Sequence, residues 1–184
     1  MNKAHDAWRS ASSYPELCAL GAAFLTGDLD HFPGWGAPQT DEETDWVEEV
    51  LVGCCQAGFL TVASQRGLPP QSGPDDRPEK RRAFVTGFVD ETASRALEDL
   101  IGPDLAVVRE LEEDLALGLR GEEHFLAIGP EAREAELALF AQNLGPEGMV
   151  ALERTHWVCV VDLIWGRDDH LWPALAACLG TPYP

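Results

Sequence analysis

The sequence predicts a single α+β domain in which one mixed sheet of four to five strands packs against helices. Three observations carry this prediction. The chain has 184 residues and is 45% hydrophobic, which is enough for one buried core. Segments with the 3.6-residue period of amphipathic helices alternate with short runs rich in Val, Phe and Thr. Neither an internal repeat nor a long linker divides the sequence, so we expect residues 1–184 to form one unit.

The first expected helix follows a clear start signal. Ser13 and Glu16 have the spacing of a capping box, and Pro15 fits the first turn of a helix. An apolar stripe comes next, and Gly27 ends it. We therefore expect one amphipathic helix between Ser13 and Gly27.

A second helix is expected before the first strand. Thr40 and Glu43 repeat the capping-box spacing, and Gly58 fits the position after the last turn. The apolar face comprises Trp46, Val47, Val50 and Cys54. The opposite face carries Glu42, Asp45, Glu48 and Glu49. Carboxylates near a helix N-terminus stabilise the helix. Acidic residues farther along this face are expected to point into solvent.

The remaining elements follow from local patterns. Strands are expected at residues 59–63, 80–90, 105–108, 125–128 and 157–165. Helices are expected after Asp90, over residues 131–143, and from Asp168 or Asp169 to Gly180. Residues 157–165 are apolar on both faces except at Asp162, which is typical of a central strand.

Residues 64–79 are the least regular part of the sequence. They contain four prolines and two glycines, so we expect neither a helix nor a strand there. A loop of this length inside a compact domain is usually functional or disordered. The segment is therefore the first place to look for a site.

The charge of the chain excludes some functions. The 32 acidic and 13 basic residues give a net charge of −19. This charge argues against nucleic-acid binding through a broadly basic surface, because the field of the protein repels phosphate. No apolar run approaches the roughly 20 residues that span a bilayer, and the start of the sequence has no apolar segment of a signal peptide. We therefore expect a cytoplasmic protein that binds neither nucleic acid nor membrane directly.

The five cysteines suggest reduced thiols, because their number is odd and no C-x-x-C pair occurs. The adjacent Cys54 and Cys55 are interpreted as helix packing rather than as a redox pair. Cys159 is expected in the core, and His156 falls on the opposite face of the same strand. These two residues are therefore not expected to form a nucleophile–base pair.

Motifs of the common cofactor and catalytic classes are absent from the sequence. The five histidines lack the spacing of a zinc site. The sequence has neither a phosphate-binding P-loop nor the G-x-S-x-G elbow of serine hydrolases. We expect no metal and no cofactor, and the sequence leaves open whether the protein is an enzyme.

One segment has an unusual local charge. Residues 66–82 hold five of the 13 basic residues of this acidic chain. Arginine provides paired donors for carboxylate or phosphate, so we predict a site for a small anionic ligand beside the turn at residues 64–67. Its candidate residues are Ser64, Gln65, Arg66, Arg81 and Arg82. The alternative is that these arginines neutralise acidic helices expected at residues 41–49 and 110–114.

Two residues near the end of the central strand extend this candidate site. Asp162 interrupts an apolar segment, so it is either buried with a partner or near a pocket. Arg167 follows the strand and either pairs with an acidic helix or lines the same pocket.

Four stretches of the sequence resemble an uncharacterised domain family of streptomycetes and related actinobacteria. They are residues 39–44 (QTDEET), 58–67 (GFLTVASQRG), 81–88 (RRAFVTGF) and 165–175 (WGRDDHLWPAL). The family turn reads S-Q-P-G and its next motif Q-R-A, whereas this chain has Arg66 and Arg81 in place of the proline and glutamine. The resemblance covers nearly the whole chain and implies a cytoplasmic actinobacterial protein, and it carries no established activity.

Two functions fit these observations. The first is an interaction protein of the immunity, anti-restriction or DNA-mimic type, which docks a basic protein partner through acidic residues such as Glu42, Asp45, Glu48 and Glu49. The second is a small-molecule-binding protein or enzyme of secondary metabolism with the anion site described above. A continuous carboxylate surface would favour the first, and a pocket with converging Arg and Asp side chains would favour the second.

Overall fold

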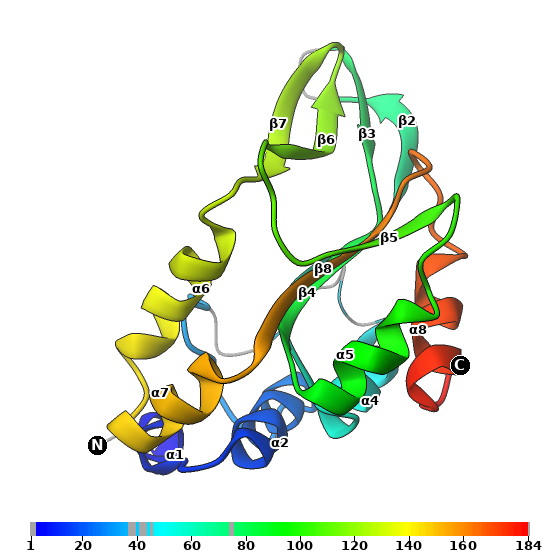
Figure 1. Cartoon of the computed structure of the whole chain (residues 1–184). Coiled ribbons are helices and arrows are strands. Elements are labelled where there is room, and N and C mark those ends of the chain that lie inside the picture. The colour runs from blue at the N-terminus through cyan, green and yellow to red at the C-terminus, as the bar shows by residue number, and fades with distance from the viewer. Residues whose placement is uncertain (1–2, 37–39, 41–43, 45, 74–75, 184) are drawn as a thin grey trace.

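The structure is a computed structural model that describes residues 3–36, 40, 44, 46–73 and 76–183. Its helices are α1 (Lys3–Ser10), α2 (Tyr14–Leu25), α4 (Glu48–Gln56), α5 (Glu91–Glu98), α6 (Ala132–Ala141), α7 (Pro146–Glu153) and α8 (Leu171–Leu179). Its strands are β1 (Phe59–Gln65), β2 (Leu68–Ser72), β3 (Pro78–Arg81), β4 (Phe84–Val89), β5 (Leu105–Val108), β6 (Leu115–Arg120), β7 (Glu123–Ile128) and β8 (His156–Asp162). This arrangement is consistent with a single α+β domain, as predicted (Figure 1).

The first sheet forms the centre of the molecule. Its strand order is β1-β4-β8-β5, and every pairing is antiparallel. Phe84 and Phe88 of β4 pack into one buried cluster with side chains of α1, α2, α6 and α7. Val85 and Val89 pack into a second cluster with side chains of α4, α5 and α8. Both faces are therefore covered, which explains the two apolar faces of these strands.

The second sheet stands above the first in Figure 1. Its strand order is β2-β3-β6-β7, again antiparallel throughout. The chain passes from one sheet to the other through Arg82 and Ala83, so the strand expected at residues 80–90 is divided between them. The one mixed sheet of the prediction is thus two antiparallel sheets of four strands each.

The prediction of an irregular loop at residues 64–79 was wrong. Residues 68–72 and 78–81 are strands β2 and β3, which pair with each other. β2 lies at the edge of its sheet, and Pro69 and Pro70 fall within the register shift between Leu68 and Gln71, where a missing backbone N–H is tolerated. The prolines that suggested a loop therefore lie in an edge strand.

The start of α2 agrees with the capping box. Glu16 Oε2 accepts hydrogen bonds from the backbone N–H groups of Ser12 at 2.7 Å and Ser13 at 3.2 Å. The Tyr14 hydroxyl donates to the Phe88 carbonyl at 2.5 Å and accepts from the Leu60 N–H at 3.2 Å. The first turn of α2 is thereby tied to the middle of the first sheet.

Other helix boundaries agree in part with the prediction from the sequence. Asp90 caps α5 by accepting from the Ala93 N–H at 2.8 Å, and Gly58 has the positive φ of 87° that follows a helix end. Glu43, the second residue of the predicted box that starts with Thr40, lies outside the described residues. The described helix α4 begins at Glu48.

Two expected helical segments are corrected. α8 begins at Leu171 after His170, because the Asp168 carboxylate bonds to the β1–β2 turn instead of capping the helix. Residues 110–114 connect β5 to β6 and are not helical. Within the described ranges, none of the helices has the length and apolar character needed to cross a membrane.

Candidate functional site

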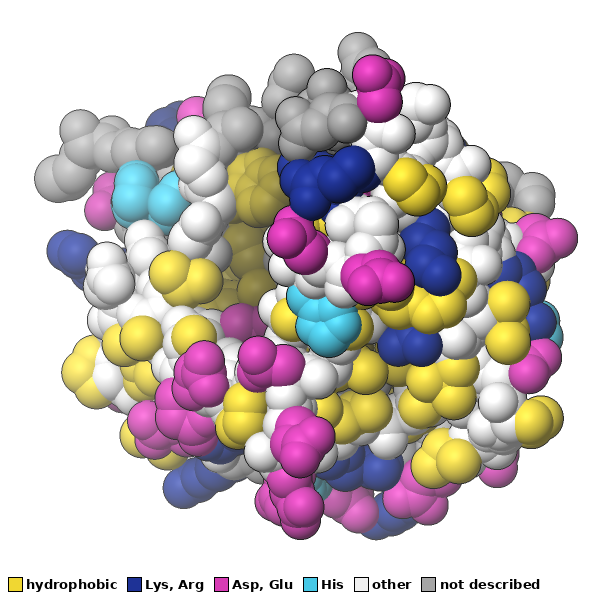
Figure 2. Space-filling model, turned by 90° about the horizontal axis from the view of Figure 1, so that it is seen from above, with side chains coloured by type: hydrophobic (Ala, Val, Ile, Leu, Met, Phe, Trp, Pro, Cys, Tyr) yellow, Lys and Arg dark blue, Asp and Glu magenta, His cyan; other side chains and the backbone are white. Residues whose placement is uncertain are grey.

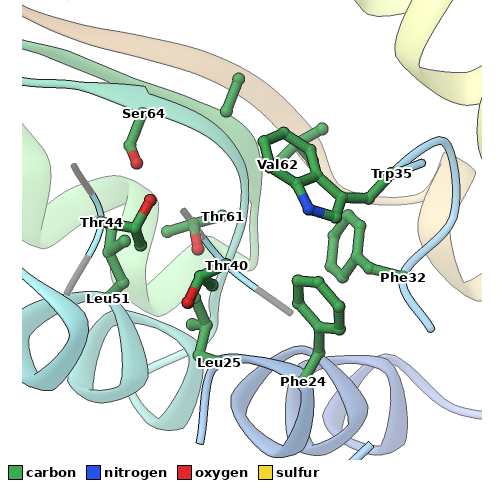
Figure 3. A pocket seen from close by; sticks show the side chains of 11 residues that line it. Phe24, Leu25, Phe32, Trp35, Thr40, Thr44, Leu51, Thr61, Val62 and Ser64 are labelled. Atoms are coloured by element: carbon green, nitrogen blue, oxygen red, sulfur yellow. The ribbon is translucent and has the colours of Figure 1, made fainter. Parts of the chain in front are cut away.

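A pocket of about 90 Å³ lies at the edge of the first sheet, where β1 is the outermost strand. Helices α2 and α4, together with Phe32, Trp35, Thr40 and Thr44, enclose it (Figure 3). The lining residues are Phe24, Leu25, Phe32, Trp35, Thr40, Thr44, Leu51, Thr61, Val62, Ala63 and Ser64. Of the residues predicted for the anion site, only Ser64 is among them.

The pocket combines aromatic rings with hydroxyl groups. The rings of Phe24 and Phe32 lie with centroids 5.4 Å apart, and Trp35 extends toward Val62 across the opening. Threonine and serine side chains provide the polar atoms. All eleven lining residues are uncharged. Such a lining suits an uncharged, largely apolar group with one or two hydrogen-bonding atoms.

A β-bulge shapes the sheet side of the pocket. Thr61 pairs with Gly87 and Ala63 pairs with Thr86, so Val62 is the extra residue of β1. In Figure 3 the Val62 side chain points at the indole of Trp35. Because β1 is an edge strand, its outer backbone N–H and C=O groups are directed toward this region and can bind a ligand.

The predicted turn at residues 64–67 is held by contacts within the protein. The Gln65 side chain donates to the Arg82 carbonyl at 3.4 Å. Arg66 Nε donates to Asp168 Oδ2 at 2.7 Å, and its guanidinium lies 4.1 Å from the Trp46 ring centroid. The turn is therefore fixed in place, and Arg66 already has a carboxylate partner.

Asp162 and Arg167 also bind each other. Asp162 is fully buried, and it accepts from Arg167 Nε at 2.7 Å and from the Ile164 N–H at 2.8 Å. Arg167 Nη1 donates to Asp104 Oδ2 at 3.0 Å. Of the two alternatives left open by the sequence, the structure shows the buried Asp with a partner.

Arg81 and Arg82 do not converge on one site. Arg81 donates to the buried Glu79 at 2.8 and 3.0 Å, and Arg120 donates to the other oxygen of Glu79. Arg82 Nη1 donates to the Ala116 carbonyl at 3.0 Å instead. The predicted cluster of arginines is thus divided. Among the described residues, the carboxylates that pair with its members belong to neither acidic segment named from the sequence.

The acidic residues proposed for partner binding are only partly described. Glu48 and Glu49 lie in the first turn of α4, whereas Glu42 and Asp45 lie outside the described residues. The exposed acidic connection at residues 110–114 lies at a different level of the molecule from α4 in Figure 1. On the face shown in Figure 2, acidic side chains gather on one side, and Lys and Arg side chains are interleaved with hydrophobic ones on the other.

Glu136 of α6 is a titratable group that sequence analysis missed. Its carboxylate accepts from Thr86 Oγ1 at 2.8 Å and from Trp157 Nε1 at 2.8 Å. Burial raises the pKa of Glu136 to about 7. The signal was present in the sequence, because Glu136 stands four residues from both Ala132 and Phe140 on the apolar face of the helix.

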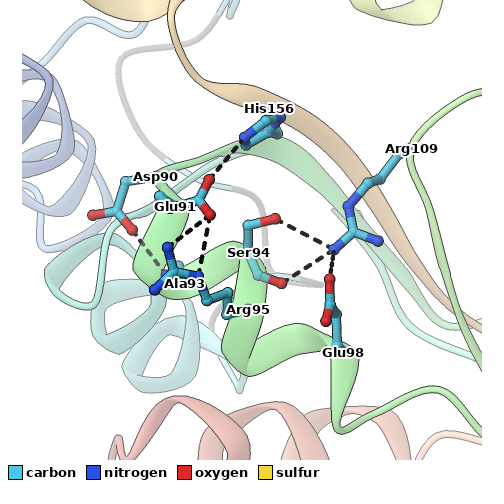
Figure 4. A network of polar contacts seen from close by, with 8 residues as sticks. All are labelled: Asp90, Glu91, Ala93, Ser94, Arg95, Glu98, Arg109 and His156. Atoms are coloured by element: carbon cyan, nitrogen blue, oxygen red, sulfur yellow. Dashed lines mark hydrogen bonds and ion pairs between the residues drawn. The ribbon is translucent and has the colours of Figure 1, made fainter.

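The outer surface of α5 carries a separate polar network (Figure 4). His156 Nε2 lies 3.3 Å from Glu91 Oε2, and Arg95 donates to the other oxygen of Glu91 at 2.9 Å. Arg109 donates to the Ser94 carbonyl at 3.1 Å. These exposed contacts tie α5 to the start of β8 and to the residue that follows β5.

The thiols are packing groups. Cys54, Cys55 and Cys159 are fully buried, as predicted, and burial raises the pKa of each thiol. His156 is exposed and lies on the opposite face of β8 from Cys159. Among the described residues, His, Cys, Asp and Glu side chains form no group of three that could hold a metal ion.

Comparison with known proteins assigns the chain to a protein family. A family model described as "Domain of unknown function (DUF6919)" matches residues 3–181. The chain belongs to this family. No curated protein matches the sequence. The match of this DUF6919 domain spans both sheets and the pocket, and the family description assigns no activity to them.

Proposed function

We propose that this DUF6919 domain binds a small organic molecule in the pocket at the edge of β1. The observation that supports this proposal is the lining itself, in which aromatic rings and hydroxyl groups enclose a hollow beside an edge strand. Concave sites that are mostly apolar and carry a few polar atoms are the usual form of small-molecule sites.

The lining indicates the class of ligand. With about 90 Å³ of space and no charged lining residue, the pocket fits one ring or a short branched chain. The hydroxyls of Thr61 and Ser64 lie on the β1 side and can bond to a hydroxyl or carbonyl of the ligand. An aromatic or alicyclic alcohol is the simplest molecule with these properties.

A pair of matched variants tests the proposal. Val62→Trp would fill the pocket, whereas Val150→Trp introduces the same side chain at an exposed position of α7. Thermal unfolding would be followed with benzyl alcohol, indole and cyclohexanol. We expect stabilisation of the wild type and of V150W that is lost in V62W. Equal shifts in all three proteins, or no shift in any, would contradict the proposal.

A second candidate is docking of a basic protein partner in the cytoplasm. It is supported by the net charge of −19 and by Glu112, Glu113 and Asp114, which are exposed in the β5–β6 connection and have no ion pair among the described residues. Replacing these three residues by their amides should slow association with such a partner and weaken its dependence on salt. An association rate unchanged by the replacement would exclude this face.

A further inference from the structure

Two basic residues near the junction of the sheets lack a carboxylate partner. In the segment identified from the sequence, Arg66 pairs with Asp168, Arg77 with Glu123 and Arg81 with Glu79. Across the described part of the chain, Lys80 and Arg82 form no ion pair. In a protein of net charge −19, two basic residues that lie two positions apart and form no ion pair are unexpected, because carboxylates greatly outnumber basic groups.

Lys80 and Arg82 share one aromatic contact. Lys80 Nζ lies 5.1 Å and Arg82 Cζ 4.2 Å from the ring centroid of Trp165. The two residues alternate along the chain, so their side chains leave the backbone on the same side. The Gly166 N–H donates to the Arg81 carbonyl at 3.0 Å, which fixes Trp165 beside β3. The two cations and the indole therefore form one group, here called the Trp165 group.

The hydrogen bonding of Arg82 is incomplete. Its Nη1 has the Ala116 carbonyl as acceptor, but its Nε is buried and has no acceptor. A buried donor without an acceptor destabilises the folded protein. Burial also lowers the pKa of Arg82 from its ordinary value, and the charge of Asp162 opposes this shift only in part. An anion beside the guanidinium would supply further opposite charge.

We propose that the Trp165 group binds a phosphate group, either inorganic phosphate or a phosphate monoester. Two cations match the double negative charge of a phosphate monoester, whereas a carboxylate would leave one cation uncompensated. Arg82 contributes planar guanidinium donors and Lys80 contributes a mobile point charge. Arg81 is not part of the site, because Glu79 neutralises it.

The Trp165 group is separate from the pocket proposed above. Gln65 donates to the Arg82 carbonyl, and the preceding residue, Ser64, lines the pocket. The two sites therefore lie near each other in the folded protein, although their residues are distant in the sequence. Phosphate binding does not depend on the pocket, because inorganic phosphate has no apolar part.

Phosphate titration followed by two-dimensional ¹H–¹⁵N NMR tests the proposal in a buffer of low ionic strength, which limits screening. The Trp165 indole N–H is the reporter. We expect saturable shifts of this signal, weakened about tenfold in Lys80→Gln and absent in Arg82→Gln. Arg95→Gln is the matched control, since it removes one exposed arginine from α5 and should bind phosphate like the wild type.

The other outcomes are equally decisive. No saturable shift in the wild type, or equal affinity in wild type and K80Q, would overturn the proposal. Equal affinity for acetate and phosphate would overturn the assignment to phosphate. If R82Q does not fold, K80Q still tests the site, because the Lys80 side chain is partly exposed and makes no hydrogen bond or ion pair with another described residue. Indole and benzyl alcohol, which test the pocket, should leave the Trp165 signal unchanged.

Discussion

Arg167 donates two hydrogen bonds to Asp162, from Nε to Oδ2 at 2.7 Å and from Nη2 to Oδ1 at 2.9 Å. The pair joins the end of β8 to the loop that leads to α8. The contact from Arg167 to Asp104 adds the start of β5. A polar residue that interrupts an apolar strand therefore holds three segments together at the junction between the two sheets.

Replacing Arg167 by alanine should destabilise the protein strongly. Asp162 is fully buried and, among the described residues, would keep only the Ile164 N–H as a donor, so a buried carboxylate would lose its hydrogen-bonded cation. We expect a loss of about 3 kcal/mol in the free energy of unfolding. Urea denaturation would measure it. Arg95→Ala, which breaks an exposed pair on α5, should cost less than about 0.5 kcal/mol. Equal losses in the two variants would show that the Arg167 pair has no special role.

Gly67→Ala should disturb the β1–β2 turn. A Cβ atom at Gly67 would lie 2.0 Å from the Arg167 carbonyl oxygen, so one backbone segment would have to move. The same movement would weaken the hydrogen bond from the Gly67 N–H to Asp168. We expect a loss of about 1–3 kcal/mol by thermal or urea unfolding. Gly36→Ala is the control, since a Cβ there meets no atom within 4 Å.

Glu136→Gln should change the pH dependence of stability. Because the pKa of Glu136 is raised to about 7 in the folded protein, the native carboxyl keeps its proton at pH values where the unfolded chain has lost it. Stability from this group is therefore greatest in acid and falls as the pH rises from the ordinary pKa of 4.5 toward 7. The Gln side chain has no proton to lose.

Urea unfolding of both proteins at two pH values measures this effect. Between pH ~5 and ~8, the wild type should lose about 2 kcal/mol relative to E136Q. The amide of Gln can still accept from Trp157 and can donate to the Thr86 hydroxyl, so the packing of α6 should be retained. A constant difference between the two proteins would show that Glu136 titrates at its ordinary pKa.

The thiols should be unreactive in the native protein. Burial raises the pKa of Cys18 to about 12 and raises the pKa of each of the other four as well. We expect at most Cys178, which is only half-buried, to react with iodoacetamide at neutral pH. Mass spectrometry should show all five alkylated after unfolding in urea. Rapid alkylation of Cys54 or Cys55 in the native state would revive the redox interpretation of that pair.

The sequence predicts most elements whose boundaries are set locally. The capping box at Ser13, the cap at Asp90 and the glycine after α8 each depend on a few adjacent residues. The apolar pattern of residues 157–165 correctly predicted the central strand β8. Such local signals predict structure reliably because the side chains that create them contact residues only a few positions away.

The second sheet could not be predicted in the same way. Leu115, Leu117 and Leu119 alternate along β6, a signal that sequence analysis missed. Most of β2 has no such pattern, and its place in the sheet comes from pairing with β3. α1 and α7 were also missed, because each is short and has only a few buried side chains. Arg82 and Ala83 lie between β3 of the second sheet and β4 of the first, and nothing local marks the change of sheet.

The anion site was predicted from local charge, whereas the pocket in the structure is lined by uncharged residues. Arg66, Arg81 and Arg167 each found a carboxylate of the protein itself, at Asp168, Glu79 and Asp162. Sequence distance hid only the partner of Arg66, which lies 102 residues away, whereas Glu79 and Asp162 lie two and five residues from their arginines. Ser64 lines the pocket because the bulge in β1 and the approach of Trp35 bring distant aromatic residues beside it.

The most direct test of the proposed pocket is a ¹H–¹⁵N NMR titration of the wild-type protein with benzyl alcohol. The account predicts saturable shifts concentrated on the amides of residues 61–64 and on the indole of Trp35, with the Trp165 signal unchanged. Shifts concentrated elsewhere, or none on β1, would contradict the claim that the edge of β1 forms a ligand-binding site.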